Sequence, residues 1–164
     1  MVEKLIPYIE ELVKYPEWVT FILSMLPITE LRGSLPWAVL VGKLSWPLAI
    51  GLSIAGNLLV TLPILFFLEP ISTKFRKWPI GDRFFTWLFH RTRKKGRLIE
   101  KLEFWGLVIF VGIPLPITGA WTGSVAAFIF GVSYFRSIMA ILLGLIMSSS
   151  IVSALILSGQ YMID

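Results

Sequence analysis

The chain has 164 residues, of which 56% are hydrophobic and 15% charged, and its mean hydropathy is +0.81. Soluble domains are roughly 45–50% apolar and about 25% charged, so this composition excludes a disordered chain or a coiled coil and indicates a membrane protein. The chain has no cysteine, and His90 is its one histidine. Disulfides and thiolate metal sites are therefore excluded, and we expect neither a zinc enzyme nor a Ser-His catalytic site.

Positive charge is concentrated in residues 69–103, which carry ten basic and four acidic side chains. Residues 1–68 carry four basic and five acidic groups, and residues 104–164 carry one of each. Short loops rich in Lys and Arg stay cytoplasmic, so we place 69–103 in the cytoplasm. A basic segment beside a membrane span is typical of an orientation signal or of contact with anionic lipid; we expect membrane lipid, and no nucleic acid, as its partner.

The N-terminal part of the chain predicts a short amphipathic helix followed by a broken hairpin. Apolar residues recur at helical spacing over residues 2–14, too short a stretch to span a bilayer. We expect this helix in the interface. The start lacks a basic n-region and a small-residue cleavage site, so we expect no signal peptide.

Residues 18–42 consist of two apolar arms, 18–26 and 37–42, on either side of the segment 27–36. Neither arm has the roughly 20 residues that a spanning helix needs. One continuous helix would bury Glu30 and Arg32 near mid-membrane and would break at two prolines. We therefore predict a re-entrant hairpin, which leaves the membrane on the side it entered; broken backbone at that depth must be packed in protein or line a wet cavity.

The next element is a full span over residues 46–68, with a small-residue face (Gly51, Ser53, Ala55, Gly56) for close helix packing. Residues 69–103 form the basic loop and a second amphipathic helix that Asp82 caps. A second broken hairpin follows, with an apolar arm at 104–113, an uncharged break at 114–124 and a second arm at 125–131. Residues 137–158 are the second full span.

The element order and one short motif predict an internal repeat. Pro27-Ile-Thr29 recurs as Pro116-Ile-Thr118, an offset of 89, at which Gly42 falls on Gly131. Residues 1–68 are repeat 1, 69–103 begin repeat 2, and 104–164 hold hairpin 2 and the last span. Because each repeat crosses the membrane once, the second is inverted and both termini lie outside. The predicted fold is a single all-α integral membrane domain of two inverted repeats, with hairpin tips near the midplane, the layout of secondary transporters.

Glu30 and Arg32 are the sharpest functional candidates, because charges inside a membrane are expensive and are usually functional or paired. Residues two apart do not face each other on a helix, and in an extended tip they diverge, so we expect each to serve a different partner. In the functional interpretation Glu30 is a protonatable coupling group, and Arg32 binds an anionic substrate group or keeps Glu30 charged. The alternatives are a structural ion pair or tip cap, and a surface loop outside the membrane.

The other candidates lie in or near the two breaks. Thr29, Thr118, Trp121 and Thr122 are candidates to line a central substrate site, and Arg136 is a further binding candidate, although a snorkelling interface role is favoured for it. The residues that we expect to shape the hairpins are Pro27, Gly33, Pro36, Pro114, Pro116, Gly119 and Gly123. We predict no catalytic residue, no metal ligand and no cofactor, and we assign Asn57 to helix–helix contact.

The segments Thr29-Glu-Leu-Arg-Gly-Ser-Leu-Pro36 and Pro114-Leu-Pro-Ile-Thr-Gly-Ala-Trp-Thr-Gly-Ser124 resemble the two signature segments of the small multidrug export protein family. That family resembles the larger DedA (VTT) superfamily. The resemblance implies inverted re-entrant hairpins in the plasma membrane of a prokaryote and a transporter-like function. DedA relatives are linked to proton-dependent movement of lipid, including polyprenyl phosphate carriers. DedA proteins carry arginine in the second hairpin, whereas this segment has Ala120-Trp121-Thr122 and the nearest arginine is Arg136.

We therefore predict a secondary transporter or lipid translocator coupled to protons or another ion, with a small molecule or a lipid phosphate as substrate. The alternative is a non-transporting membrane-organising or assembly protein. An enzyme is not expected, because no nucleophile–base pair is visible. Since one short chain offers few walls for a substrate path, we expect a homodimer.

Overall fold

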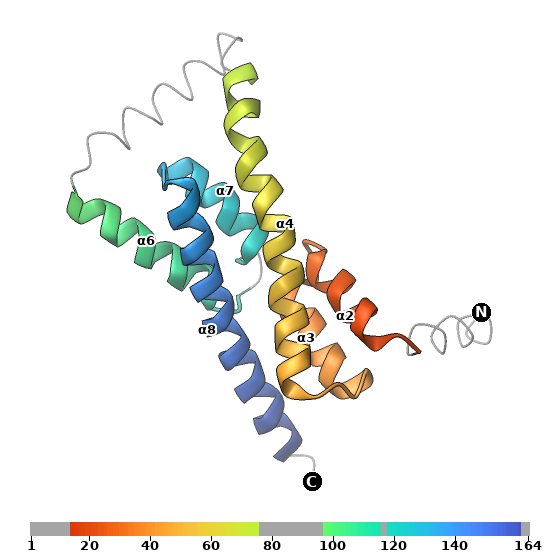
Figure 1. The fold of residues 1–164 in the computed structure, drawn as a ribbon. Coiled ribbons are helices and arrows are strands. Elements are labelled where there is room, and N and C mark those ends of the chain that lie inside the picture. Colours follow the sequence, from red (N-terminus) through yellow and green to blue (C-terminus); the bar gives the residue numbers. More distant parts are fainter. Residues whose placement is uncertain (1–13, 76–96, 116–117, 162–164) are drawn as a thin grey trace. The chain divides into compact units, whose positions relative to one another are not determined.

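The computed structural model describes residues 14–75, 97–115 and 118–161, and every regular element in these residues is a helix (Figure 1). The elements are α2 (Pro16–Met25), α3 (Glu30–Pro36), the π-helical turn η2 (Trp37–Val41), α4 (Trp46–Phe75), α6 (Arg97–Gly112), α7 (Ala120–Phe130) and α8 (Tyr134–Tyr161). The predicted all-helical class is confirmed for these residues. The amphipathic helix predicted at 2–14 and the cap predicted at Asp82 lie outside the described residues.

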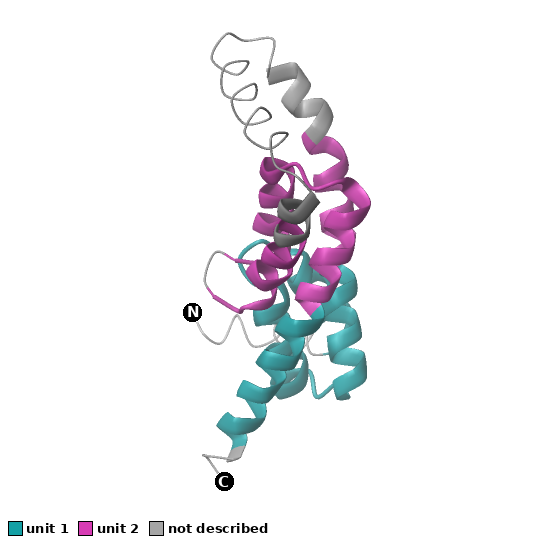
Figure 2. Cartoon of the chain, turned by 90° about the vertical axis from the view of Figure 1, so that its left-hand side faces the viewer, with its two compact units in different colours: residues 1–57, 146–164 teal, residues 58–145 magenta. Residues whose placement is uncertain are grey.

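The chain divides into two compact units (Figure 2). The first comprises residues 1–57 and 146–164, and the second comprises residues 58–145. Unit 1 holds α2, α3 and η2 with the first part of α4 and the last part of α8, and unit 2 holds α6 and α7 with the remainder of the two long helices. Each unit therefore combines one pair of short helices with parts of both long helices.

The helices α4 and α8 are long and apolar enough to cross a membrane, over Trp46–Leu68 and Tyr134–Gln160, and the prediction of two helices of spanning length is confirmed. On α4 most of the buried side chains are small or polar, such as Ser53 and Asn57, with Leu65 as an exception, whereas Leu59 and Phe66 are exposed. A surface helix in water has the opposite arrangement. Large apolar side chains are stable on the outside where lipid surrounds them, so α4 has the surface of a membrane helix.

The first pair of short helices, which we call hairpin 1 (α2, the turn 26–29, α3 and η2), folds back on itself. α2 packs against both α3 and η2. The two ends of the hairpin meet, because a Cβ atom added to Gly42 would lie 3.0 Å from Cβ of Pro16. The chain therefore enters and leaves hairpin 1 at the same end.

The break in hairpin 1 is shorter than the predicted segment 27–36, because the helix resumes at Glu30 and continues through Pro36. Proline has no N–H to donate, and its ring crowds the preceding turn. The next residues form the wider π-helical turn η2, in which the N–H of Gly42 donates to the carbonyl of Trp37 at 2.9 Å. A π-turn relieves the crowding at Pro36 without ending the helix, so only Pro27 lies in the turn.

The second pair, hairpin 2 (α6, residues 113–119 and α7), has the same order of elements. Helix α7 begins at Ala120, inside the segment 114–124 that was predicted to be broken, and it ends at Gly131, whose φ of 71° is the left-handed conformation of a helix C-cap. Helix α6 continues through Glu103. The predicted boundary between an amphipathic helix ending at 103 and an arm starting at 104 is therefore wrong, because apolar residues follow at helical spacing with no breaker between them.

Glycines mark the tightest helix contacts in each unit. In unit 1, a Cβ on Gly56 of α4 would lie 1.9 Å from Oγ of Ser24 and 2.6 Å from the carbonyl oxygen of Phe21, both on α2. In unit 2, a Cβ on Gly144 of α8 would lie 2.7 Å from Cβ of Val111 on α6. Of the predicted small-residue face of α4, Ser53 and Gly56 lie in this packing, whereas Gly51 has no atom near its missing Cβ.

Candidate functional site

Glu30 begins α3 in a conformation that side chains rarely adopt. Its φ is 44°, and Lys43 is the one other described residue besides glycine with a positive φ. The backbone N–H of Glu30 donates to the carbonyl of Leu26 at 2.9 Å, and the residue is only 7% exposed. A left-handed backbone costs a non-glycine residue about 1 kcal/mol, and such strain clusters at functional sites. The fold thus holds a carboxylate in a buried and strained position.

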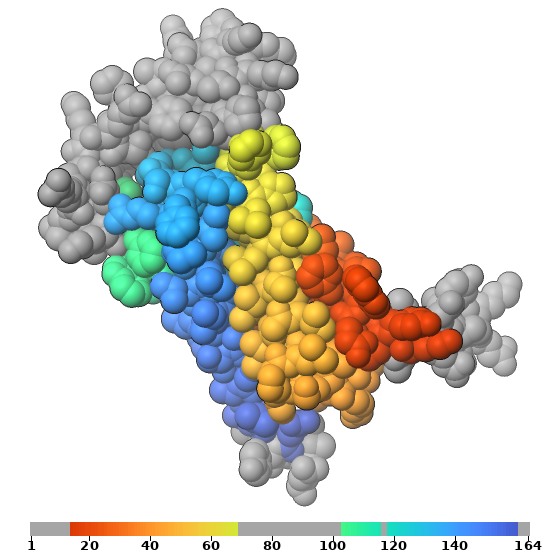
Figure 3. Space-filling view, viewed as in Figure 1, coloured from red at the N-terminus to blue at the C-terminus, as the bar shows by residue number. Residues whose placement is uncertain are grey.

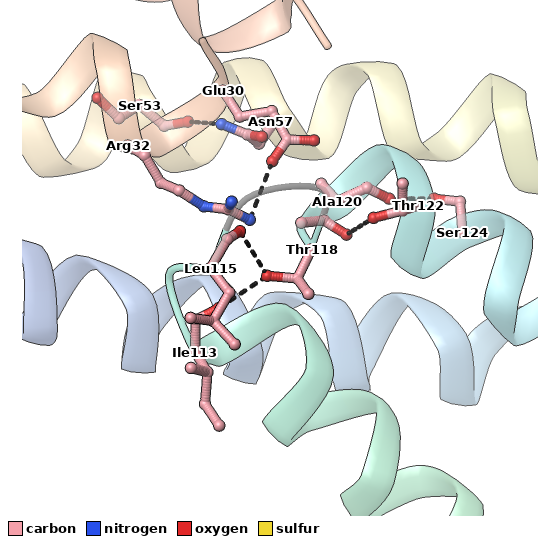
Figure 4. A network of polar contacts seen from close by, with 11 residues as sticks. Glu30, Arg32, Ser53, Asn57, Ile113, Leu115, Thr118, Ala120, Thr122 and Ser124 are labelled. Carbon is pink, nitrogen blue, oxygen red and sulfur yellow. Dashed lines mark hydrogen bonds and ion pairs between the residues drawn. The ribbon is translucent and has the colours of Figure 1, made fainter. Parts of the chain in front are cut away.

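Arg32 forms an ion pair with this carboxylate (Figure 4). The distance from Nη2 of Arg32 to Oε2 of Glu30 is 3.6 Å, and the two side chains are 22% and 9% exposed. The expectation that the two side chains diverge is wrong, because the left-handed φ of Glu30 takes its side chain out of the regular helical register. The contact is longer than the 2.7–2.9 Å that is typical of a charge-assisted hydrogen bond, so it neutralises the two charges without locking them together.

A layer of buried polar side chains joins α3 to α4 beside this pair. The hydroxyl of Ser34 donates to Oγ of Ser53 at 2.9 Å, and Nδ2 of Asn57 donates to the carbonyl of Ser53 at 2.8 Å. The short connection 42–45 makes these consecutive helices antiparallel neighbours. Glu30 precedes Ser34 by one turn and Asn57 follows Ser53 by one turn, so the same register places Glu30 beside Asn57, and Figure 4 draws the two side chains together.

The burial of these residues agrees with that register. Ser34, Ser53 and Asn57 are at most 1% exposed. Ala38 and Ala49, the next pair in the register toward the connection, are completely buried. We call Glu30, Ser34, Ser53 and Asn57 the polar layer. It lies within unit 1 and offers a carboxylate, hydroxyls and an amide that can hold or transfer a proton or bind a polar group.

Thr29 and Gly33 shape the turn that carries Glu30. The hydroxyl of Thr29 donates to the carbonyl of Leu23, and the N–H of Gly33 donates to the carbonyl of Thr29 at 2.8 Å. A Cβ on Gly33 would lie 2.9 Å from Cβ of Thr29. Thr29 was predicted as a substrate-binding residue, and its hydroxyl here closes the tip of hairpin 1.

The candidates in unit 2 make backbone contacts instead. The hydroxyl of Thr118 donates to the carbonyls of Ile113 and Leu115, both at 2.9 Å, and the hydroxyl of Thr122 lies 3.4 Å from the carbonyl of Gly119. Trp121 is half-buried. These hydroxyls donate hydrogen bonds to backbone carbonyls where α6 ends and α7 begins. Ser and Thr side chains commonly form such bonds to nearby backbone groups.

The remaining predicted residues of unit 2 differ in their surroundings. Arg136 is exposed near the start of α8. A Cβ on Gly123 would lie 2.5 Å from Cγ2 of Val111, so this glycine sets the spacing of α6 and α7. Pro114 is half-buried after α6, whereas Pro116 lies outside the described residues.

Sequence reasoning assigned Asn57 to helix packing and did not select Ser34 or Ser53. The available signal was the short connection between η2 and α4, which fixes an antiparallel register and pairs Ser34 with Ser53. The register could not be inferred from the sequence, because Pro36 indicated that the helix ends before this connection. The shorter break therefore changes the site as well as the fold.

In the part of the chain that the structure describes, every regular element is a helix, two of these helices are apolar and long enough to span a membrane, and Glu30 and Arg32 form a largely buried ion pair. These features are those of a helical membrane protein. Residues 30–151 match the model of the family described as "Putative small multi-drug export protein", and the chain belongs to this family. The family name indicates a role in membrane transport and a transporter rather than an enzyme. No curated protein and no solved structure matches the chain.

Proposed function

We propose that this protein is a secondary transporter driven by protons, in which Glu30 carries the coupling proton and Arg32 binds an acidic group of the substrate. The observation that carries the proposal is the largely buried ion pair between Arg32 and Glu30 at the start of α3, where the backbone of Glu30 is strained. Buried ionisable groups in membrane proteins mark ion and substrate pathways.

Charge balance supports an acidic substrate. With Glu30 ionised and paired to Arg32, the site is neutral. If a substrate anion takes the guanidinium, the carboxylate loses its partner, and a buried unpaired carboxylate is costly. Protonation of Glu30 restores neutrality, so one proton accompanies each negative charge that binds. A cationic substrate would leave the site with a net positive charge in either protonation state.

The topology of the proposal is that of two inverted repeats. Hairpin 1 enters the bilayer from outside and hairpin 2 from the cytoplasm, with residues 69–103 cytoplasmic and both termini outside. The meeting of Pro16 with Gly42 supports a hairpin that returns to its own side. This is the arrangement expected of a DedA-type translocator, and a lipid phosphate is one acidic substrate of that kind.

A second candidate function is a non-transporting membrane-organising protein. The closed pair of Glu30 and Arg32 favours it, because a paired tip is what a purely structural role requires. In that case the ion pair fixes the geometry of the turn and never exchanges partners. The two functions differ in whether Glu30 takes up a proton.

Reconstituted vesicles distinguish the two. We expect the wild-type protein to acidify the lumen when a lipophilic carboxylate or phosphate is supplied across a proton gradient, as measured with an entrapped pH dye. Glu30→Gln keeps the size of the side chain and removes its charge, so it should abolish the proton flux while the protein still folds. Glu103→Gln, on α6 of hairpin 2, should behave as wild type. Equal flux through wild type and Glu30→Gln would contradict the coupling role, and no flux through wild-type protein would favour the structural function.

A further inference from the structure

A groove on the surface of unit 1 is separate from the polar layer. It lies between α2 and α4 and is lined by Glu17, Trp18 and Phe21 of α2 and by Leu52 of α4, with a volume of about 470 Å³. Figure 3 shows α2, in red, beside α4, in yellow and orange, with the N-terminal end of α2 directed away from α4. This volume is within the range of sites that bind small molecules. The groove has apolar walls and a single carboxylate.

Glu17, which lines the groove, is preceded by a lysine three residues earlier in the chain. Lys14 and Glu17 are both exposed, three residues apart, at the start of α2. The ammonium of Lys14 lies 5.7 Å from the ring centre of Tyr15, and among the described residues neither Lys14 nor Glu17 has an ion-pair partner. The groove therefore has one carboxylate among its lining residues, and an exposed lysine precedes this carboxylate by three residues.

Trp18 indicates the depth of this part of the groove. Its side chain is 65% exposed although it is large and aromatic. Tryptophan is enriched at the boundary between head groups and acyl chains, where its ring contacts the chains and its N–H stays near water. Lys14 and Glu17 precede Trp18 on the chain, so they lie at head-group level when Trp18 occupies this boundary.

We propose that this groove binds a diacyl phospholipid with a primary ammonium head group, namely phosphatidylethanolamine. Its acyl chain lies along Trp18, Phe21 and Leu52, its ammonium contacts the carboxylate of Glu17, and its phosphate contacts the ammonium of Lys14. The match is one of charge, because a zwitterionic head group presents one cation and one anion, opposite in sign to Glu17 and Lys14. The site uses neither Glu30 nor Arg32 and stands independently of the proposed transport.

The chemistry of Glu17 separates this lipid from the other common phospholipids. A primary ammonium donates hydrogen bonds to a carboxylate, and such charge-assisted bonds are about twice as strong as neutral ones. The quaternary ammonium of phosphatidylcholine has no N–H to donate. Phosphatidylglycerol has no cation for Glu17 and brings an additional negative charge beside it.

The test is native mass spectrometry of the full chain in detergent, titrated separately with dioleoyl-phosphatidylethanolamine, -phosphatidylcholine and -phosphatidylglycerol. We expect the first lipid adduct with phosphatidylethanolamine to form at about tenfold lower lipid concentration than with the other two, since a hydrogen bond to a charged group contributes about 1.5 kcal/mol. Glu17→Gln should abolish this preference. Lys14→Gln should weaken phosphatidylethanolamine and phosphatidylcholine alike.

Two further variants separate the role of the charge at Glu17 from that of the apolar wall and of a carboxylate elsewhere. Trp18→Ala should weaken all three lipids about equally, because it removes a wall and not the selecting charge. Glu103→Gln, on α6 and two residues before the exposed Trp105, should retain the wild-type preference. Equal affinity of the wild type for the three lipids, a preserved preference in Glu17→Gln, or loss of the preference in Glu103→Gln would each overturn the proposed site.

Discussion

Hairpin 1 and hairpin 2 are built alike but hold different chemistry at their turns. In each, a short apolar helix precedes a turn, a second short helix returns, and a long apolar helix follows. In hairpin 1 the first turn of α3, directly after the break, carries the ion pair of Glu30 and Arg32, and Glu30 has a strained backbone. The turn of hairpin 2 carries Thr118, whose hydroxyl bonds to backbone carbonyls of its own unit. By sequence, residues 113–119 carry no ionisable side chain, so of the two breaks the one in hairpin 1 is followed by a group that can exchange a proton or an ionic partner.

The two hairpins also share the way in which they attach to the long helices. Helix α2 packs closely against Gly56 of α4, and α6 packs closely against Gly144 of α8. Neither position leaves room for a side chain. These glycines are separated by nearly the offset that relates Pro27-Ile-Thr29 to Pro116-Ile-Thr118. A close glycine contact between a short and a long helix therefore occurs in each unit, and the ion pair of Glu30 and Arg32 lies in unit 1.

The largest expected effect is an all-or-none difference in labelling. The chain has no cysteine, so single cysteines need no background removal. Tyr15→Cys and Lys43→Cys, at the two ends of hairpin 1, should react with an impermeant thiol reagent from the same side of the membrane. Ser133→Cys, after hairpin 2, should react only from the opposite side, because the second repeat is inverted in the proposed topology.

The labelling can contradict the topology in two ways. If Tyr15→Cys and Lys43→Cys react from opposite sides, hairpin 1 crosses the membrane and is not re-entrant. If Ser133→Cys reacts from the same side as Tyr15→Cys and Lys43→Cys, hairpin 1 is still re-entrant, but the two repeats are not inverted. Labelling of every variant after solubilisation is the control for intrinsic reactivity.

The next largest effect is on stability, at the two glycine contacts. Gly56→Leu should lower the free energy of unfolding by about 3 kcal/mol, since overpacking typically costs 1–3 kcal/mol and its Cβ would meet the backbone of Phe21 at 2.6 Å. Gly144→Leu should cost about 2 kcal/mol. Gly51→Leu is the control, because no atom lies near its missing Cβ. Thermal unfolding in detergent measures all three, and an unchanged midpoint for Gly56→Leu would contradict the α2–α4 contact.

The sequence predicted the helical class, the two apolar helices of spanning length and the charged turn, because composition and apolar run length determine them directly. It did not predict the length of the breaks. Pro36 favours a helix end on local grounds, yet the chain continues the helix through a π-turn that packs against α2. Tertiary packing decided that point, and with it the register that places Ser34 against Ser53. Single-residue preferences contain no information about such a partner.

A smaller difference is expected between two arginines. Arg32→Ala leaves the carboxylate of Glu30 buried without the guanidinium, and the loss of one partner of a buried pair costs several kcal/mol. Because the Arg32 side chain is 22% exposed, water can replace part of the interaction, and we expect about 2 kcal/mol. Arg136→Ala should cost less than about 0.5 kcal/mol, since Arg136 is exposed. Restoration of stability by Glu30→Gln in the Arg32→Ala background would show that the unpaired charge is the cause, and equal effects of the two arginine variants would remove Arg32 from the site.

The smallest effect concerns buried serines in the two units. Ser53→Ala removes the acceptor of the Ser34 hydroxyl, an interhelical bond of 2.9 Å, so we expect a loss of about 0.6–1 kcal/mol, the range for such bonds within membranes. Ser124→Ala is the matched control in unit 2, because the hydroxyl of Ser124 donates to the carbonyl of Ala120 in its own helix at 2.7 Å and its removal leaves no other side chain without a partner. A double-mutant cycle of Ser34→Ala and Ser53→Ala isolates the pair. A coupling energy indistinguishable from zero would mean that α3 and α4 are not in the register that places Glu30 beside Asn57, and the polar layer would then lose its geometric basis even if the ion pair of Glu30 and Arg32 remained.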